Sequence, residues 1–125
     1  MNQIIKGKVI KGKGLGHKVG MPTANIELKD ENVKLGVYAS ITSFDNERYM
    51  SVTNVGPRPS IDNSTVNKVE TYILDFSKDI YGQEIEVELV KHLRDIQKFN
   101  NIEEVHEQVE KDIKSTIELL KDKIW

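Results

Sequence analysis

The strongest constraint on the fold is a change of hydrophobic period about three quarters of the way along the chain. Before it, apolar and polar residues alternate: Ile85, Val87 and Leu89 are interleaved with glutamates, the period of two of a strand with one wet face. After it, apolar residues recur at spacings of three and four, which predicts one apolar stripe on a helix. This stripe comprises Ile102, Val105, Val109, Ile113, Ile117, Leu120 and Ile124. The chain is therefore expected to be mainly β, with one long C-terminal helix.

Further segments of the first three quarters are predicted to be strands. Residues 37–42 alternate in the same way, and the turn residues Asp45, Asn46 and Glu47 lead into a second strand around 49–55, which predicts a hairpin. Residues 4–10 and 66–76 are two more strand candidates. Five or six short antiparallel strands in a chain of 125 residues predict one barrel or sandwich domain.

The helix has a predicted start at Asn101. Asn101 followed by Glu104 resembles a capping box, with Asn in place of the usual Ser or Thr. We expect the apolar stripe to pack on the chain's own barrel, and a partner helix is the alternative.

Composition narrows the class of protein. The chain has no cysteine, no apolar run of the roughly 18 residues that span a bilayer, and no signal-peptide core in residues 1–20. We therefore expect a cytoplasmic protein. Residues 1–20 carry five lysines and no acid, in a chain with a net charge of −2. The lysines suit either a phosphate ligand or a solvated sheet edge, and charge alone leaves both open.

A glycine-rich stretch is the most unusual local feature. Gly12, Gly14, Gly16 and Gly20 let the backbone turn tightly and bring its N–H groups close to a ligand. Neither the Walker nor the dinucleotide-binding spacing is present. A phosphate-binding loop and a plain β-turn both remain open.

The next residues, Thr23 and Asn25, offer two neutral hard oxygens. Alternation along an extended segment puts both on one side, where they suit a Mg²⁺ ion held partly by substrate phosphates. Turn capping is the alternative role, and spacing alone favours it.

The complete pattern resembles the riboflavin kinase family over essentially the full chain. Five ordered segments carry the resemblance: the glycine pattern from Gly7 into Gly20-Met21-Pro22-Thr23-Ala24-Asn25, Gly36-Val37-Tyr38-Ala39, Asn54-Val55-Gly56-Pro57-Arg58-Pro59-Ser60, Val69-Glu70-Thr71-Tyr72-Ile73-Leu74-Asp75-Phe76, and Asp79-Ile80-Tyr81-Gly82 followed by Leu93-Arg94 and Lys98-Phe99.

The resemblance implies a fold and an activity. The fold is a six-stranded antiparallel Greek-key β-barrel with a long C-terminal helix packed on it, and residues 1–125 form a single kinase domain. The activity is transfer of the γ-phosphate of ATP to the ribityl 5′-hydroxyl of riboflavin, which gives FMN and ADP with Mg²⁺ as cofactor. The expected partners are these small molecules, with neither nucleic acid nor membrane, and the chain is expected to be a monomer.

The resemblance also implies residue roles. Glu70 is the catalytic base, and Thr23 and Asn25 hold Mg²⁺ and the phosphates. The flavin is assigned to Arg94 and Phe99. The remaining residues assigned to the nucleotide are Gly12, Gly14, Gly16, His17, Lys18, Gly20, Pro22 and Tyr81. Independently of the family, neither face of the strand around Glu70 is plainly the wet one, so partial burial, which suits a general base, is open. An edge-strand glutamate in solvent is the alternative, and the pattern alone favours it.

The sequence departs from the family at four positions. His17 stands where arginine is frequent, Met21 replaces a bulkier aromatic, Ser60 replaces threonine and Tyr72 replaces histidine. His17 is the departure that bears on ATP affinity, because a neutral imidazole attracts phosphate less than a guanidinium does. None of the four removes the expected base or metal ligands.

Other residues and other functions are weighed against this assignment. His92 and His106 lack partners at metal-ligand spacing, so packing or surface roles are expected for them, and packing is expected for Trp125. A barrel that senses flavin or nucleotide without turnover is the main alternative function. A barrel binding single-stranded nucleic acid ranks last, because aromatic residues make up only 6% of the chain. The sequence leaves open whether the kinase is free-standing or a piece of a larger protein.

Overall fold

The computed structural model describes residues 3–10, 23–27, 33–58, 66–74 and 80–123. The described elements are, in chain order, β1 (Gln3–Lys8), β2 (Ala24–Glu27), β3 (Gly36–Phe44), β4 (Glu47–Arg58), β5 (Val66–Ile73), β6 (Glu84–Arg94) and α2 (Ile102–Leu120). All neighbouring strands pair antiparallel, in the order β1-β6-β3-β4-β5-β2.

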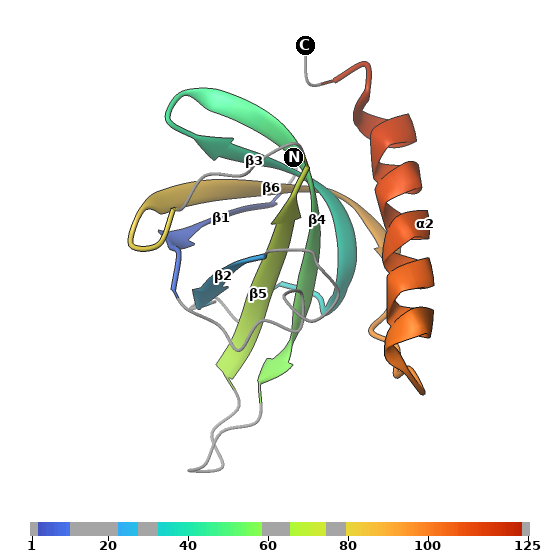
Figure 1. The fold of residues 1–125 in the computed structure, drawn as a ribbon. Helices are drawn as coiled ribbons and strands as arrows, with labels where there is room; N and C mark the ends of the chain where they lie inside the picture. Colours follow the sequence, from blue (N-terminus) through green and yellow to red (C-terminus); the bar gives the residue numbers. More distant parts are fainter. Residues whose placement is uncertain (1–2, 11–22, 28–32, 59–65, 75–79, 124–125) are drawn as a thin grey trace.

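The sheet is rolled into an open barrel whose two edge strands, β1 and β2, approach each other (Figure 1). An isolated bridge joins the two edges where the Ile10 N–H donates to the Asn25 carbonyl at 2.8 Å. Strands distant in sequence lie side by side, β1 with β6 and β2 with β5, as Greek-key connections require. The expected six-stranded antiparallel Greek-key barrel with a C-terminal helix is confirmed. The sequence pattern had not singled out β2 as a strand, because four residues are too few to show a period.

The predicted hairpin is β3 and β4. Phe44 pairs with Glu47, and the two residues between them, Asp45 and Asn46, have φ values of 52° and 63°. Positive φ at both positions is the backbone of the hairpin turns that match the twist of the strands, and Asp and Asn adopt it at low cost.

Apolar side chains fill most of the barrel interior. Alternate residues of each strand point inward, and the most buried among them include Ile26, Val55, Val69, Ile85 and Val87, none more than 1% exposed. The glutamate-flanked residues of β6 therefore face the core, as the alternating pattern predicts.

A group of hydroxyls shares the interior with these apolar residues. Ser40, Thr42, Ser51, Thr53 and Thr71 all have zero exposure. Ser40 Oγ lies 2.6 Å from Ser51 Oγ and 2.7 Å from Thr53 Oγ1, Thr42 donates to Ser51 Oγ at 2.8 Å, and Thr53 and Thr71 are 3.1 Å apart. Because each hydroxyl has a partner, this polar group is buried without the cost of an unpaired donor or acceptor.

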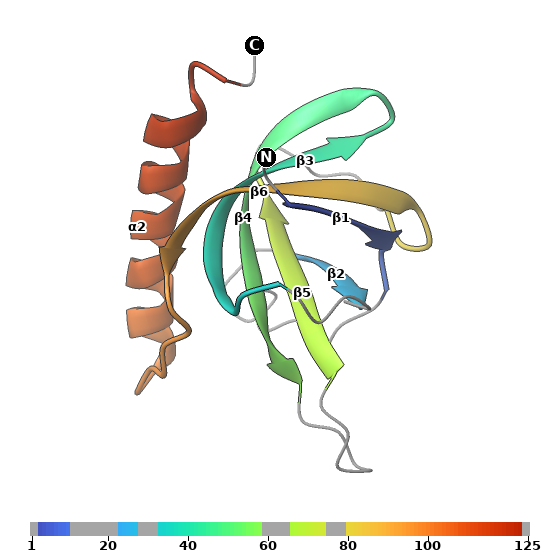
Figure 2. The same ribbon diagram turned by 180° about the vertical axis from the view of Figure 1, so that it is seen from behind.

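Helix α2 packs on the outer side of the barrel wall, against β3 and β4 (Figures 1 and 2). Its buried residues are Asp112, Thr116 and Leu120, whereas Ile102 and Ile117 of the apolar stripe are 48% and 43% exposed. The helix does pack on its own barrel, but it is rotated so that one edge of the stripe faces solvent. A buried ion pair of Asp112, described below, lies within this contact.

The start of the helix is where the sequence predicts it. The Asn101 side chain accepts a hydrogen bond from the Glu104 N–H at 2.9 Å. The return bond differs from a capping box, because Glu104 accepts from the N–H of Asn100, at 3.1 Å, and not from that of Asn101. The regular helix ends at Leu120, four residues before the last apolar residue of the predicted stripe.

Two structural findings bear on the lysines of the first segment and on the search for a membrane span. Lys6 lies on the edge strand β1 and pairs with Glu86 of β6 at 3.3 Å, which favours a solvated sheet edge for this lysine. Within the described ranges, no helix has the length and apolar character needed to cross a membrane.

Candidate functional site

Three polar residues form a row across the outer face of β2, β5 and β4. Asn25 is paired with Glu70, and Glu70 is paired with Asn54. The residues that alternate with them, such as Val69 and Val55, belong to the core, so this row points to the other side of the sheet. Directly opposed residues on neighbouring strands have Cβ atoms about 5 Å apart, so groups from three strands converge around one carboxylate.

Glu70 is the central residue of this row. Its side chain is 23% exposed, so of the two alternatives that the sequence left open the structure shows partial burial. Lys68 lies two residues earlier, on the same face of β5, and its Nζ is 2.5 Å from Glu70 Oε1. The ammonium group compensates the charge of the half-buried carboxylate and holds one of its two oxygens. Sequence reasoning missed Lys68, although the period of two already put it beside Glu70.

Two buried oxygens near this row lack hydrogen-bond partners within the described part of the chain. They are Thr23 Oγ1 and Asn25 Oδ1, and Asn25 is only 3% exposed. A buried polar atom without a partner costs about 1–3 kcal/mol, so such atoms commonly have a ligand. Neutral hydroxyl and amide oxygens are ligands that Mg²⁺ accepts, which means that these residues fit the ion suggested by the sequence. With two neutral donors, most of the coordination has to come from phosphate oxygens and water.

Tyr81 lies in a turn that contacts the chain leading toward the glycine-rich stretch. The Gly82 N–H donates to the Val9 carbonyl at 2.8 Å, and the Val9 N–H donates to the Gln83 carbonyl at 2.9 Å. Gly82 has a φ of 80°, which this turn requires and glycine adopts readily. The Tyr81 side chain is 45% exposed. The turn thus brings Tyr81 close to Val9 and Ile10, which directly precede residues 11–22.

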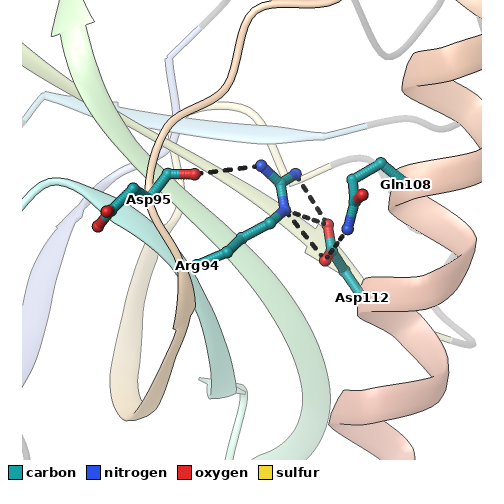
Figure 3. Close-up of polar contacts among 4 residues, drawn as sticks. All are labelled: Arg94, Asp95, Gln108 and Asp112. Atoms are coloured by element: carbon teal, nitrogen blue, oxygen red, sulfur yellow. Dashed lines mark hydrogen bonds and ion pairs between the residues drawn. The ribbon is translucent and has the colours of Figure 1, made fainter.

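Arg94 and Phe99, which the resemblance assigns to the flavin, lie close together. The Arg94 guanidinium carbon lies 5.8 Å from the centre of the Phe99 ring. The guanidinium, however, is already held by Asp112 of α2, with Nη2 3.0 Å from Oδ2 (Figure 3). Sequence reasoning missed Asp112, and the available signal was a carboxylate inside an apolar helix stripe, three residues after Val109.

The remaining expected nucleotide-binding residues lie outside the described residues. They are Gly12, Gly14, Gly16, His17, Lys18, Gly20 and Pro22, and the positions Met21, Ser60 and Trp125 lie outside as well.

The two described histidines make packing and surface contacts. The His92 ring packs edge-on against Tyr38, with the ring centres 5.1 Å apart, and His106 pairs with Glu110 on the helix surface at 3.7 Å. Burial raises the pKa of the Tyr38 hydroxyl, which donates to the Lys34 carbonyl. Among the residues described, no three His, Asp or Glu side chains are grouped as metal ligands would be.

Comparison with known proteins gives consistent matches along the chain. The sequence model of the family described as Flavokinase, riboflavin kinase, matches residues 2–120. The chain is 36% identical over 110 residues to the RNA-binding riboflavin kinase RibR of Bacillus subtilis, covering 88% of this chain and 48% of that protein. It is 40% identical over 113 residues to a bifunctional riboflavin kinase/FMN adenylyltransferase of Haemophilus influenzae, covering 89% of this chain and 36% of that protein.

The fold is also found in a solved structure. The riboflavin kinase of Trypanosoma brucei superposes with a TM-score of 0.64 over 96% of this chain and 80% of that chain, at 23% sequence identity. At this identity the likeness shows a shared fold. The chain spans half or less of the length of the two curated relatives, so their full activities are not carried over by the match.

Proposed function

Because the chain belongs to the riboflavin kinase family, we propose that it transfers the γ-phosphate of ATP to the ribityl 5′-hydroxyl of riboflavin. In this reaction the hydroxyl oxygen forms a bond to the γ-phosphorus, the bond from that phosphorus to the β–γ bridging oxygen breaks, and FMN and ADP result. The observation that carries the proposal is the half-buried Glu70 beside Asn25, whose buried Oδ1 has no partner among the described residues.

Glu70 is the proposed general base. As the oxygen–phosphorus bond forms, the hydroxyl proton passes to the carboxylate. The oxygen that Lys68 does not hold, Oε2, is the natural acceptor, because Oε1 already lies 2.5 Å from the ammonium group. The base is expected to contribute about 10²–10⁴-fold to the rate, and positioning and electrostatics supply the remainder.

Thr23 and Asn25 are the proposed ligands of Mg²⁺. When bound, the ion neutralises charge on the transferring phosphate. The two side chains supply a hydroxyl and an amide oxygen, and their location on and just before β2 supports a phosphate donor on the β2 side of Glu70. The neighbouring turn at Tyr81 supports a place for the nucleotide on the same side.

The row across the sheet supports an order for the two substrates. Asn25 lies on one side of Glu70 and Asn54 on the other. If the phosphate donor occupies the β2 side, the acceptor hydroxyl has to approach Glu70 from the β4 side. The attacking and leaving oxygens of phosphoryl transfer lie roughly in line with the phosphorus, and this arrangement permits such a line.

The test is FMN formation by the purified chain and by its Glu70→Gln variant. Riboflavin, ATP and Mg²⁺ are supplied, and the flavins are separated chromatographically. The variant keeps the side-chain shape but lacks the base, so we expect kcat to fall by about 10²–10⁴-fold. Glu84→Gln makes the same charge change at an exposed position of β6 and is the matched control, expected to keep full activity.

Two outcomes would contradict the proposal in different ways. Full turnover by Glu70→Gln would exclude this residue as the base. Riboflavin binding by the parent chain without any FMN would replace the kinase by a barrel that senses flavin. The assignment of residues 1–125 to one kinase domain, the cytoplasmic location and the monomeric state remain predictions.

A further inference from the structure

Arg94, the last residue of β6, is the centre of a polar network that reaches α2 (Figure 3). Its Nε donates to both carboxylate oxygens of Asp112, at 3.2 and 3.3 Å, and Nη2 donates to Oδ2 at 3.0 Å. Gln108, one turn earlier on the helix, donates to Asp112 Oδ1 at 3.1 Å. The guanidinium is thereby locked in one orientation from the helix side.

The pair is too deeply buried to be an ordinary surface ion pair. The Asp112 side chain is 5% exposed and that of Arg94 is 21% exposed. Burying a carboxylate costs free energy that the pairing only roughly offsets, so stability alone is a weak reason to have it. A buried pair of fixed geometry is better suited to hold a side chain, or a segment attached to it, in one place.

The segment that this pair holds is the connection from β6 to α2. Arg94 Nη1 donates to the Asp95 carbonyl at 3.3 Å, and the guanidinium lies over the Phe99 ring. The connection from Asp95 to Asn100 has no regular secondary structure, and most of it is exposed. Its first residue and its aromatic ring are both anchored to the one guanidinium, so the orientation of Arg94 sets the path of the connection.

This connection lies beside the β4 side of the row centred on Glu70. Ile96 and Asn54 both lie next to Gly56 of β4. A Cβ atom built on Gly56 would be 3.6 Å from Ile96 Cδ1 and 3.6 Å from Asn54 Oδ1. Asn54 is the residue opposite Glu70 on β4. The apolar side chain of Ile96 is 43% exposed and lies next to the row centred on Glu70. The connection therefore borders the space from which the acceptor has to approach Glu70.

We propose that Asp112 is a positioning residue for the flavin substrate, acting through Arg94 on the 95–100 connection. This inference rests on the proposed kinase function and adds a residue to it. Asp112 itself touches no substrate. It fixes the guanidinium, the guanidinium fixes the connection, and the connection forms the acceptor side of the site. Loss of Asp112 then affects riboflavin and leaves ATP, on the β2 side, largely unaffected.

The test is a double-mutant cycle of Asp112→Asn and Arg94→Met, with kcat and the KM of each substrate measured for both single variants and the double variant. Small misplacements of a binding element cost up to about a hundredfold, so we expect Asp112→Asn to raise the KM for riboflavin by about tenfold or more. The KM for ATP should change by less than about twofold, a factor that corresponds to only about 0.4 kcal/mol. Because Asp112 acts through Arg94, the double variant should be no worse than Arg94→Met alone.

The control is Glu118→Gln, which makes the same charge change in a surface ion pair of the same helix and should leave both KM values unchanged. Equal rises in both KM values, no rise in the KM for riboflavin, or additive effects in the cycle would overturn the inference. If Asp112→Asn does not fold, Gln108→Leu removes the second hydrogen bond to Asp112 Oδ1 and should raise the KM for riboflavin alone; an unchanged value would overturn the inference.

Failure of the kinase proposal can be separated from failure of this inference. Turnover by the parent chain is measured first and tests the kinase alone. Riboflavin binding, followed by quenching of flavin fluorescence, tests Asp112 whether or not turnover occurs. A Kd for riboflavin raised about tenfold by Asp112→Asn supports the positioning role, and an unchanged Kd in a variant that folds contradicts it.

Discussion

At the scale of single residues, Gly36 shows how close the chain comes to itself at the start of β3. Its φ is 151°, and a Cβ at this position would lie 2.2 Å from His92 Nε2 and 2.8 Å from the Arg94 carbonyl oxygen. The second atom belongs to the backbone and cannot move aside easily. Gly36→Ala is therefore expected to lower the free energy of unfolding by roughly 1–3 kcal/mol, as measured by urea denaturation.

Gly56→Ala is the matched control for this prediction. A Cβ there would find its nearest neighbours at 3.6 Å, an ordinary contact distance. Its unfolding free energy should stay within about 0.5 kcal/mol of the parent value. If both variants are equally stable, the close approach of His92 and Arg94 does not restrict position 36.

The site at this scale was only partly predictable from the sequence. Glu70 and Asn25 were identified as chemical groups, but their opposition across β5 and β2 depends on strand register, which one sequence does not specify. The place of Lys68 beside Glu70 could have been predicted from the alternating pattern of the strand. For Asp112 the sequence shows a carboxylate inside an apolar stripe, but its pairing with Arg94 could not be predicted, because Arg94 is eighteen residues away and comes from another element.

At the scale of elements, the start of α2 depends on Asn101. Its side chain satisfies the Glu104 N–H, one of the backbone donors that a helix N-terminus leaves without an internal partner. Asn101→Ala should lower the free energy of unfolding by about 1 kcal/mol, seen as a lower midpoint of thermal or urea unfolding.

Asn100→Ala is the control for the helix cap. Its side-chain contact with Glu104 is long, at 3.5 Å, and its backbone N–H bond to Glu104 survives the substitution. The loss should be well below that for Asn101→Ala. Equal losses would mean that the cap acts through the residues around it and not through the Asn101 oxygen.

The rotation of α2 shows what a periodic pattern can and cannot predict. The 3.6-residue period correctly predicted the helix, and the Asn101–Glu104 capping pattern correctly predicted its start. The period did not show which residues of the helix are buried: these are Asp112, Thr116 and Leu120, whereas Ile117 of the stripe is 43% exposed. A pattern of apolar residues carries no information on a buried ion pair such as Arg94–Asp112, which lies in this contact.

At the scale of the whole molecule, the described elements form one barrel with one helix on its outer wall (Figure 2). Alternation and turn residues predicted strands in the right places, and the resemblance supplied their number and connections. The pairing of β1 with β6, from opposite ends of the barrel sequence, could not come from local patterns. The same topology brings β2 next to β5, so the fold itself unites Asn25 with Glu70.

This arrangement leads to a prediction about which flavin the chain makes. Both relatives described above are longer proteins, one named as a bifunctional riboflavin kinase/FMN adenylyltransferase and the other as an RNA-binding riboflavin kinase. In this chain the riboflavin kinase family model matches residues 2–120. The row on β2, β5 and β4 offers one base and one candidate metal site. Transfer of an adenylyl group to FMN is a different reaction: the FMN phosphate attacks the α-phosphorus of ATP and pyrophosphate leaves, whereas Glu70 is placed to take a proton from a hydroxyl. We therefore expect the purified chain to convert riboflavin to FMN and to form no FAD.

Chromatographic separation of the flavins checks this, with riboflavin as the substrate in one sample and FMN in another. EDTA should abolish FMN formation, because the two neutral oxygens of Thr23 and Asn25 position a metal–phosphate complex and cannot themselves neutralise phosphate charge. FMN formation that survives EDTA would remove the metal from the proposal while leaving Glu70 in place. Formation of FAD from FMN would contradict this prediction and would require a site for adenylyl transfer, because the residues of this row are suited to attack by a hydroxyl at the γ-phosphorus.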